Sequence, residues 1–299
     1  MSFFLQPATL AEAVQALAET RGVVLSGGTD FFPARVDRPI TETVIDISRV
    51  RELKGISVEA DRILIGGRTT WSEIASAPLP RGFDGLKSAA REIGGIQIQN
   101  FGTVAGNLCN ASPAADSVPP LLTLDAEVRL ASASGTRTLP LADFILGNRK
   151  TARRADEILT SVAVPRRLEK AASSFLKLGT RRYLVISIVM VAVTILVDER
   201  NDKWNGDIND ERGCVAEARV AVGSCSAQAR RLPRLEESLV GAAARPGLGK
   251  LAVASHLDGV LTPLDDVRGT AAYRRDASLT LVQRAIDACV ASRSSASGV

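Results

Sequence analysis

Residues 101–120 read FGTVAGNLCN ASPAADSVPP and differ in composition from an ordinary core segment. Gly102, Ala105 and Gly106 are so small that the backbone can approach a ligand with little or no Cβ in the way. Short side chains suited to hydroxyl groups and phosphate oxygens accompany them, namely Thr103, Asn107, Asn110, Ser112 and Asp116. The stretch also contains Pro113, Pro119 and Pro120, which predict a loop rather than a long helix. By itself it is compatible either with a ligand-binding loop or with a tight connection between packed elements.

A second glycine-containing turn follows a predicted strand near the N-terminus. Val23 to Leu25 form a short apolar run typical of a strand, and the sequence SGGTD, residues 26–30, follows directly. Successive backbone N–H groups in such a turn can point into one concavity and bind an anion such as pyrophosphate. The spacing is not GxGxxG, which argues against the dinucleotide fold of nicotinamide enzymes. Most Gly-Gly pairs are only turns, so this motif gains weight only beside the first one.

Helix and strand patterns predict an α+β N-terminal half. Thr9 to Glu12 has the form of a capping box and starts a helix that ends near residue 21. The predicted strands cover residues 23–25, 44–47, 63–67 and 158–164, and a hairpin joins 127–130 to 137–139. A polar connector at 165–172 separates this half from the rest. We therefore predict a domain over 1–170, with subdomains of about 1–55 and 56–170.

The C-terminal half is predicted as a second, smaller α+β domain over 171–292, followed by a flexible tail over 293–299. Its strands are expected at 175–178 and 215–222, and the apolar run 184–197 is expected to be buried core. The helices are expected near 235–240, 250–257 and 278–290. The polar stretch 198–213 is predicted as an exposed hairpin loop, with a partner contact through Trp204 as the alternative.

Composition excludes several classes of function. The chain has 299 residues and a net charge of +4, and its basic residues are dispersed, so no nucleic-acid-binding surface is predicted. Its four cysteines show no CxxC spacing and do not cluster with the single histidine, so no metal site or iron–sulfur cluster is expected on this chain. Free thiols without an apparent export signal suggest a cytoplasmic protein. The longest apolar run, 184–197, is too short to span a bilayer.

Four separated motifs resemble one family in the same order: SGGTD at 26–30, GTVAGNLCNASPAAD at 102–116, FLKLGTRR at 175–182 and DDVRGTAAYRR at 265–275. The chain looks like the FAD-binding medium subunit of the molybdenum hydroxylases, a family that includes carbon monoxide dehydrogenase, nicotine and quinoline dehydrogenases and the flavin domain of xanthine dehydrogenase. The likeness covers nearly the whole chain. It implies an α+β, two-subdomain FAD-binding fold similar to vanillyl-alcohol oxidase, followed by a domain with a three-stranded antiparallel sheet.

The resemblance also implies which residues bind the cofactor. The two glycine motifs are expected to close on the FAD pyrophosphate from two sides, and the chain has Ala105 where the family usually has glycine. Asn110 and Asp116 match positions that bond the polar chain of the flavin, and Leu159 and Lys177 match positions beside the flavin. The full set of expected cofactor-binding residues is Leu25, Ser26, Gly27, Gly28, Thr29, Asp30, Phe31, Gly102, Thr103, Val104, Ala105, Gly106, Asn107, Asn110, Asp116, Leu159 and Lys177.

No catalytic residue and no metal ligand is predicted, because the chain has no evident acid–base or nucleophilic constellation and the flavin would carry the chemistry. The resemblance implies an electron-transfer subunit that passes electrons from [2Fe–2S] clusters on a small partner subunit to an external acceptor. The molybdenum cofactor is expected on a large partner subunit, in a dimer of heterotrimers. Two alternatives stay open, a stand-alone FAD-dependent oxidase or dehydrogenase and a non-catalytic assembly factor. The substrate and the terminal acceptor cannot be predicted.

Overall fold

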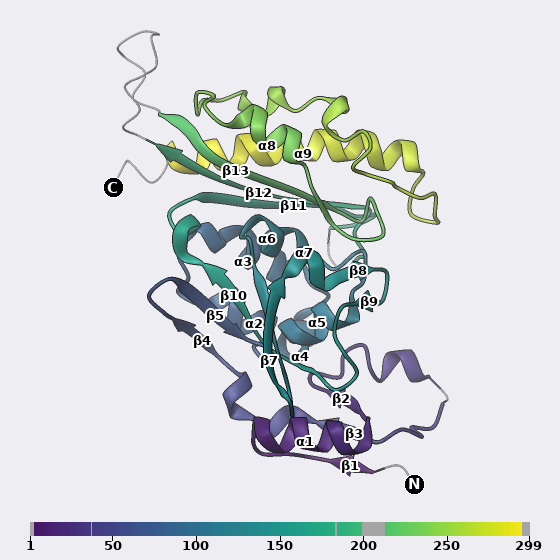
Figure 1. Ribbon diagram of the computed structural model, residues 1–299. Helices are drawn as coiled ribbons and strands as arrows, with labels where there is room; N and C mark the ends of the chain where they lie inside the picture. Colours follow the sequence, from purple (N-terminus) through teal and green to yellow (C-terminus); the bar gives the residue numbers. More distant parts are fainter. Residues whose placement is uncertain (1–2, 37, 183, 199–212, 295–299) are drawn as a thin grey trace. The chain divides into compact units, whose positions relative to one another are not determined.

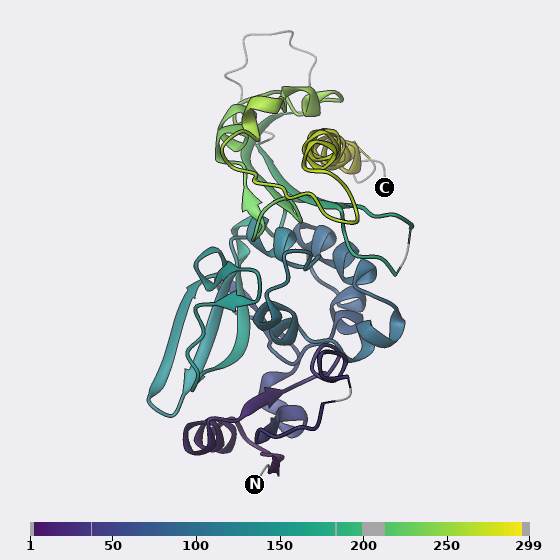
Figure 2. The same cartoon turned by 90° about the vertical axis from the view of Figure 1, so that its right-hand side faces the viewer.

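The computed structural model describes residues 3–36, 38–182, 184–198 and 213–294, which form two compact units (Figures 1 and 2). The first unit comprises Met1–Ala77, Ile93–Ser112 and Asp125–Arg166. The second comprises Pro78–Glu92, Pro113–Leu124 and Arg167–Val299. The predicted loop over 198–213 and the predicted tail over 293–299 lie almost entirely outside the described residues.

The first unit begins with a small parallel sheet in the order β1-β3-β2. Its elements are β1 (Phe4–Leu5), α1 (Leu10–Thr20), β2 (Val23–Leu25), η1 (Pro33–Arg35), β3 (Val44–Asp46), η2 (Ile47–Arg49) and η3 (Arg51–Leu53). Thr9 caps α1 by accepting a hydrogen bond from the Glu12 N–H group, as predicted. Ala13, Val14 and Leu17 bury one side of α1 against the sheet in a cluster with Ile45. The SGGTD turn therefore starts at the carboxyl end of a strand, where α/β units usually bind ligands.

A five-stranded antiparallel sheet in the order β4-β5-β10-β6-β7 forms the rest of the frame of the first unit. The strands are β4 (Ile56–Val58), β5 (Arg62–Gly66), β6 (Glu127–Ser132), β7 (Gly135–Pro140) and β10 (Ile158–Pro165). Ile63 and Ile65 are fully buried whereas Arg62 and Leu64 are half-buried, the alternation expected of a strand with one covered face. The predicted hairpin is confirmed, with Ser132 paired to Gly135 across the turn.

Short helices occupy the remaining part of the first unit. They are α2 (Trp71–Ser76), α4 (Ile96–Phe101), α5 (Val104–Asn110) and α7 (Leu141–Phe144), and a two-stranded ribbon pairs β8 (Ile145–Gly147) with β9 (Lys150–Thr151). Thr70 and Glu73 form a capping box at the start of α2, because the side chain of each accepts a hydrogen bond from the other residue's N–H group.

The prediction of a loop over 101–120 is wrong, since α5 lies within this range and α6 (Val118–Thr123) begins in it. Thr103 provides a side-chain cap for α5, and Ala111 ends that helix in a left-handed conformation with φ of 46°. Pro119 and Pro120 lie in the first turn of α6, where a missing N–H group removes no intrahelical hydrogen bond. The prolines therefore allow two short helices while excluding a single long one.

The second unit is built on an antiparallel sheet in the order β11-β12-β13-β14. Its elements are η4 (Arg81–Phe83), α3 (Asp84–Glu92), α6, η5 (Arg166–Leu168), β11 (Ala172–Leu178), β12 (Val189–Asp198), β13 (Cys214–Gly223), β14 (Arg230–Arg231), α8 (Pro233–Leu239), η6 (Leu248–Leu251), η7 (Ala254–His256) and α9 (Ala271–Ser294). Helices α8 and α9 cover one face of this sheet, and α3 and α6 cover the other (Figure 1). Along β12, Val191 packs toward α9 and Met190 toward α3, which explains why the strand is apolar throughout.

Three predictions for the second unit are wrong. The run 184–197 was expected to be buried core, but Leu184 and Ile186 are exposed and the buried part begins at Ser187. Among the described residues its sheet has four strands instead of three, because Arg230 and Arg231 pair with Ala221 and Val222. A strand of two arginines is too short and too polar to produce an alternating apolar pattern. The helix expected near 250–257 is replaced by the 3-10 turns η6 and η7, with an extended Ala252 and Val253 between them. No helix in the described part of the chain is both long and apolar enough to cross a membrane.

Candidate functional site

A cavity of about 390 Å³ lies in the first unit beside both glycine-containing motifs. Its wall combines the end of β2 and the turn after it, the start of α5, and the start of β10. The predicted site residues that line it are Leu25, Ser26, Gly27, Gly28, Thr29, Asp30, Phe31, Gly102, Thr103, Ala105, Gly106, Asn107, Asn110 and Leu159. Two motifs that are about 75 residues apart in the sequence thus share one hollow of the size typical of ligand sites.

The SGGTD turn has a backbone that only glycine permits at two positions. A Cβ atom on Gly27 would lie 1.8 Å from the carbonyl oxygen of Phe101. The turn therefore packs directly against the residue that precedes the 102–116 motif. Gly28 has a φ of +72°, a conformation that L side chains rarely adopt. The backbone N–H groups of Gly27, Gly28 and Thr29 have no hydrogen-bond acceptor among the described residues. These donors at the cavity are available to an anionic ligand.

The motif at residues 102–116 contributes to the cavity in a different way. The N–H groups of residues 104–107 all bond within the first unit, to Thr69 O, Gly67 O and the side-chain and backbone oxygens of Thr103, at 2.9–3.2 Å. This segment therefore does not form the nest of free N–H groups that the 26–30 turn forms. It offers instead a close approach of the backbone at Gly106 and the side chains of Thr103 and Asn107. The Thr103 hydroxyl donates to Ser26 Oγ over 3.2 Å and joins the two motifs.

The methyl group of Ala105, where a glycine was expected from the resemblance, is accommodated by a second glycine. A Cβ atom on Gly67 would lie 3.1 Å from the Ala105 methyl carbon and 2.5 Å from the Leu159 carbonyl oxygen. Because residue 67 has no side chain, Ala105 fits beside β10 without a displacement of the backbone of the 102–116 motif.

Three predicted site residues do not line this cavity. Val104 is 1% exposed and belongs to the core. Lys177 and Asp116 lie in the second unit, where Lys177 Nζ is 2.6 Å from Asp116 Oδ2. Lys177 also donates to the Glu92 carbonyl oxygen at 3.1 Å, and Ser187 donates to Asp116 Oδ1 at 2.5 Å. Burial raises the pKa of Asp116, while the Lys177 ammonium group and the Ser187 hydroxyl act in the opposite direction.

Several residues of the cavity wall were not predicted from the sequence. Ile47, Trp71, Ile93 and Ile98 add apolar surface to it, and Cys109, Arg153 and Glu157 add polar groups. Burial raises the pKa of the Cys109 thiol to about 11, against a smaller opposite effect of the Arg153 charge, so the protonated thiol predominates at neutral pH. Nothing in the sequence around Arg153 distinguishes it from its arginine neighbours.

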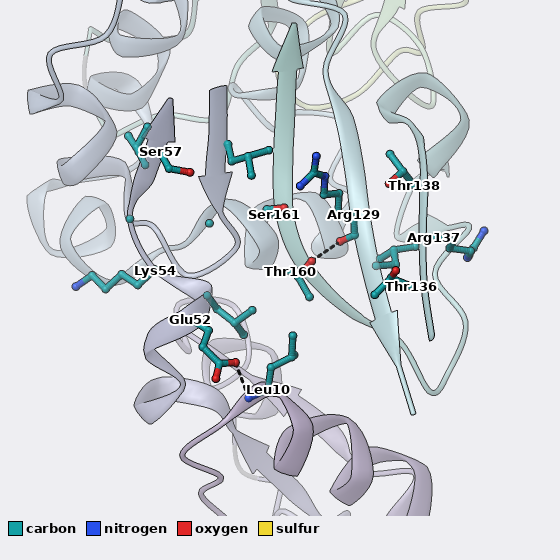
Figure 3. Close-up of a pocket in the computed structure, with 16 residues that line it drawn as sticks. Leu10, Glu52, Lys54, Ser57, Arg129, Thr136, Arg137, Thr138, Thr160 and Ser161 are labelled. Carbon is teal, nitrogen blue, oxygen red and sulfur yellow. Dashed lines mark hydrogen bonds between the residues drawn. The ribbon is translucent and has the colours of Figure 1, made fainter. Parts of the chain in front are cut away.

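A larger groove, of about 640 Å³, lies on the five-stranded sheet near the N-terminus of α1 (Figure 3). It is lined by side chains such as Glu52, Lys54, Arg129 and Arg137. Lys54 pairs with Glu73 at 2.9 Å, and Arg137 pairs with Glu157 at 2.6 Å. The residues that line this groove include Gly55 and Gly66 but no two consecutive glycines, and its cations Lys54 and Arg137 are already paired. The smaller cavity is therefore the better site for a dinucleotide.

These features define a class of protein: an α+β protein with a candidate nucleotide-cofactor site beside two glycine-containing segments of its first unit. Comparison with known families agrees. Residues 1–167 match the model of the FAD binding domain in molybdopterin dehydrogenase, and residues 174–289 match that of the CO dehydrogenase flavoprotein C-terminal domain.

Individual relatives point the same way. The chain is 39% identical to the nicotinate dehydrogenase FAD-subunit of Eubacterium barkeri, over 66% of this chain and 69% of that protein. It is 26% identical to the carbon monoxide dehydrogenase medium chain of Hydrogenophaga pseudoflava over 94% of each chain. A solved structure of carbon monoxide dehydrogenase from H. pseudoflava, which lacks the Mo-pyranopterin moiety of the molybdenum cofactor, superposes with a TM-score of 0.84 at 27% identity, covering 97% of both chains.

The chain belongs to the family of FAD-binding medium subunits of the molybdenum hydroxylases, of the carbon monoxide dehydrogenase and xanthine dehydrogenase type. It is an oxidoreductase subunit with an FAD-binding domain and the α+β fold of that family.

Proposed function

We propose that this chain carries FAD and transfers electrons from iron–sulfur clusters of a partner subunit to an external acceptor. The observation that carries the proposal is the row of backbone N–H groups at Gly27, Gly28 and Thr29 that have no partner among the described residues. This turn contacts Phe101, directly before the 102–116 motif. These donors suit the diphosphate of FAD, and the close backbone approach at Gly106 leaves room for its chain. Bound FAD would supply the two-electron chemistry, and the described residues show no acid–base constellation of their own.

The remaining expected contacts follow from this placement. Ser26, Thr103 and Asn107 would bond to the oxygens around the diphosphate, and the apolar wall at Leu159 would pack against the flavin. We extend the proposal to Asp116 and Lys177, which the resemblance assigns to the flavin. Their ion pair in the second unit would fix the orientation of both side chains.

The assembly is also a proposal. The relatives are named as an FAD-subunit and a medium chain, and on that basis we infer a small iron–sulfur subunit and a large molybdenum-cofactor subunit as partners. We infer a cytoplasmic dimer of heterotrimers, and within this chain an FAD-binding domain over 1–170 followed by a C-terminal flavoprotein domain over 171–292. Substrate would be hydroxylated on the large subunit, and this chain would exclude water from the flavin and hold it for electron transfer.

The proposal is tested by purifying the native complex and the chain alone, each loaded with FAD. We expect the substrate of the complex to reduce the flavin only when the partner subunits are present. Rapid-mixing absorption spectroscopy of the flavin band measures this. Bleaching of the flavin in the isolated chain by the same substrate would show a stand-alone oxidase or dehydrogenase instead. A wild-type chain that retains no FAD would contradict the proposal altogether.

Replacing Thr103 with valine is expected to weaken FAD binding and to lower the free energy of unfolding by about 1 kcal/mol, because α5 loses its side-chain cap. Thr9→Val is the matched control, since Thr9 caps α1 in the same unit and does not line the cavity. Both variants should lose similar stability in urea unfolding, but only Thr103→Val should raise the dissociation constant for FAD. Equal FAD affinity in the two variants would exclude a ligand role for Thr103.

A further inference from the structure

Arg153 has the features of a cofactor-binding residue that the family motifs do not include. It lines the same cavity as the two glycine motifs. Its Nη1 group donates to the carbonyl oxygens of Glu157, at 2.7 Å, and Arg154, at 3.1 Å. The Nε and Nη2 donors have no hydrogen-bond acceptor among the residues that the structure describes. A half-buried guanidinium with unpaired donors beside a cavity is suited to bind an electron-rich group of a ligand there.

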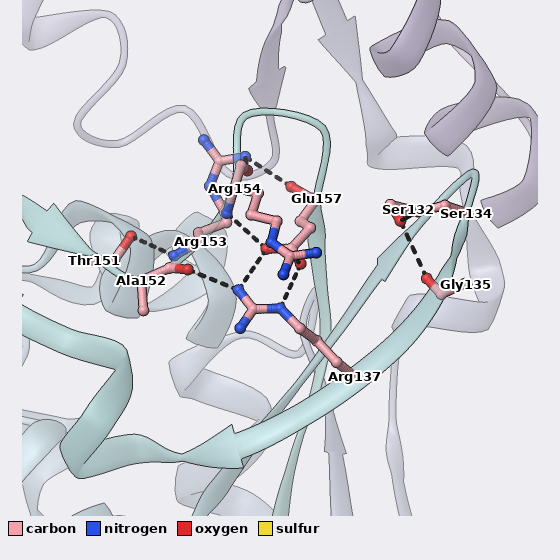
Figure 4. A network of polar contacts seen from close by, with 9 residues as sticks. All are labelled: Ser132, Ser134, Gly135, Arg137, Thr151, Ala152, Arg153, Arg154 and Glu157. Atoms are coloured by element: carbon pink, nitrogen blue, oxygen red, sulfur yellow. Dashed lines mark hydrogen bonds and ion pairs between the residues drawn. The ribbon is translucent and has the colours of Figure 1, made fainter.

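The position of Arg153 is fixed by a clamp around Glu157 (Figure 4). The Glu157 side chain is only 4% exposed and accepts two hydrogen bonds from Arg137, at 2.6 and 2.9 Å. It also accepts one from the Arg154 N–H group at 2.6 Å, while Arg137 donates to Ala152 O at 2.7 Å. The segment 152–157 is thereby closed into a rigid turn. Since Arg153 bonds to two carbonyl oxygens of this turn, its charge is held at a defined place.

That place lies away from the end of the cavity that we assign to the diphosphate. The positive charge of Arg153 acts to lower the pKa of the Cys109 thiol, and Cys109 lies in the last turn of α5. Cys109 is five residues beyond the start of α5 at Val104, which corresponds to roughly 7 Å along the helix axis. Arg153 also bonds to the Glu157 carbonyl oxygen, two residues before Leu159 on the same strand side of the cavity. Leu159 is the residue proposed to pack against the flavin.

We propose that Arg153 lies at the flavin end of the cavity, where its positive charge stabilises the reduced, anionic flavin. The proposal rests on the function proposed above, because it requires FAD in this cavity. Reduction of oxidised FAD by two electrons and one proton gives a product with one more negative charge on the ring system. A fixed cation close to that ring favours the reduced form and therefore raises the reduction potential. Glu157 and Arg137 are positioning residues for this charge.

The test measures the reduction equilibrium of the full-length chain loaded with FAD. Flavin and a reference dye are reduced together by stepwise addition of dithionite, and their absorption bands give the equilibrium constant between them. For Arg153→Gln we expect this constant to fall about tenfold, or about 30 mV for a two-electron couple. Arg153→Lys keeps the charge and should stay within about threefold of the wild type. Arg154→Gln is the matched control, because Arg154 lies on the same turn, is 68% exposed and does not line the cavity.

An unchanged constant in Arg153→Gln, or an equal fall in Arg154→Gln, would overturn the inference. If Arg153→Gln does not hold FAD, the lysine variant decides, since a tenfold fall despite the retained charge would also overturn it. FAD affinity, measured by fluorescence for each variant, separates this result from failure of the proposed function. A wild-type chain without FAD would remove the proposed function, whereas a wild-type chain with FAD and an insensitive Arg153→Gln variant would remove only the role of Arg153.

Discussion

A chain with Gly106→Leu is expected to fold and to bind FAD about 10- to 100-fold more weakly than the wild type, a loss of about 1–3 kcal/mol. A Cβ atom at Gly106 meets only the hydroxyl oxygen of Thr103, at 3.0 Å, so the backbone tolerates a side chain here. Gly106 lines the cavity, and a leucine side chain would occupy space that the cofactor needs. Fluorescence titration with FAD measures the affinity, and urea unfolding of the flavin-free chain measures the stability.

The control for this variant is Ala18→Leu, which places the same leucine side chain on the exposed side of α1. It should leave both FAD affinity and stability nearly unchanged. Gly27→Ala is a less informative variant, because its Cβ would overlap the Phe101 carbonyl oxygen and would disturb the fold as well as the site. Wild-type FAD affinity in Gly106→Leu would show that the cofactor does not pass the start of α5, and the proposed site would have to be abandoned.

The parts of the site that could be predicted from the sequence depend on local backbone geometry. Gly27 and Gly28 directly follow a short apolar strand, and a glycine turn there allows successive backbone N–H groups to point into one concavity. Together with the 102–116 motif, this pattern indicated an anion site. The capping residue Thr9 was equally predictable, because a cap is decided within four residues of the chain. The order of four such motifs was then enough to identify the family.

The parts that could not be predicted depend on contacts between distant residues. The N–H groups of Val104 and Ala105 bond to the carbonyl oxygens of Thr69 and Gly67, which lie more than 30 positions away in the sequence. A free nest and a paired helix start therefore look alike in the sequence. Arg153 is one of several arginines in a polar segment, and only the buried Glu157 beside it gives it a fixed direction. Likewise, an isolated lysine on a strand indicates a solvated face, and the sequence contains no sign that Lys177 is 6% exposed.

The Lys177→Met variant is expected to lower the free energy of unfolding by about 3–5 kcal/mol near neutral pH, because it leaves the buried carboxylate of Asp116 without its cation. Ser187 still donates to Asp116, but a single hydroxyl does not balance a buried charge. Urea unfolding measures the difference. The exposed Lys250→Met, in the same unit, is the matched control and should change stability by less than about 0.5 kcal/mol.

The loss in Lys177→Met should shrink as the pH is lowered from about 7 to about 4, and the sign follows from the pKa of Asp116. Burial already raises this pKa above the unfolded value of about 3.9, and removing Lys177 removes the main opposing effect. Between the unfolded and the folded pKa the native variant binds a proton that the unfolded chain does not, so its stability falls as pH rises through that range. Adding Asp116→Asn to Lys177→Met removes the titrating group and should recover most of the stability and abolish the extra pH dependence. A loss that stays constant over this pH range would mean that removing Lys177 does not change the pKa of Asp116, and that Lys177 stabilises the second unit by packing instead of by its ion pair.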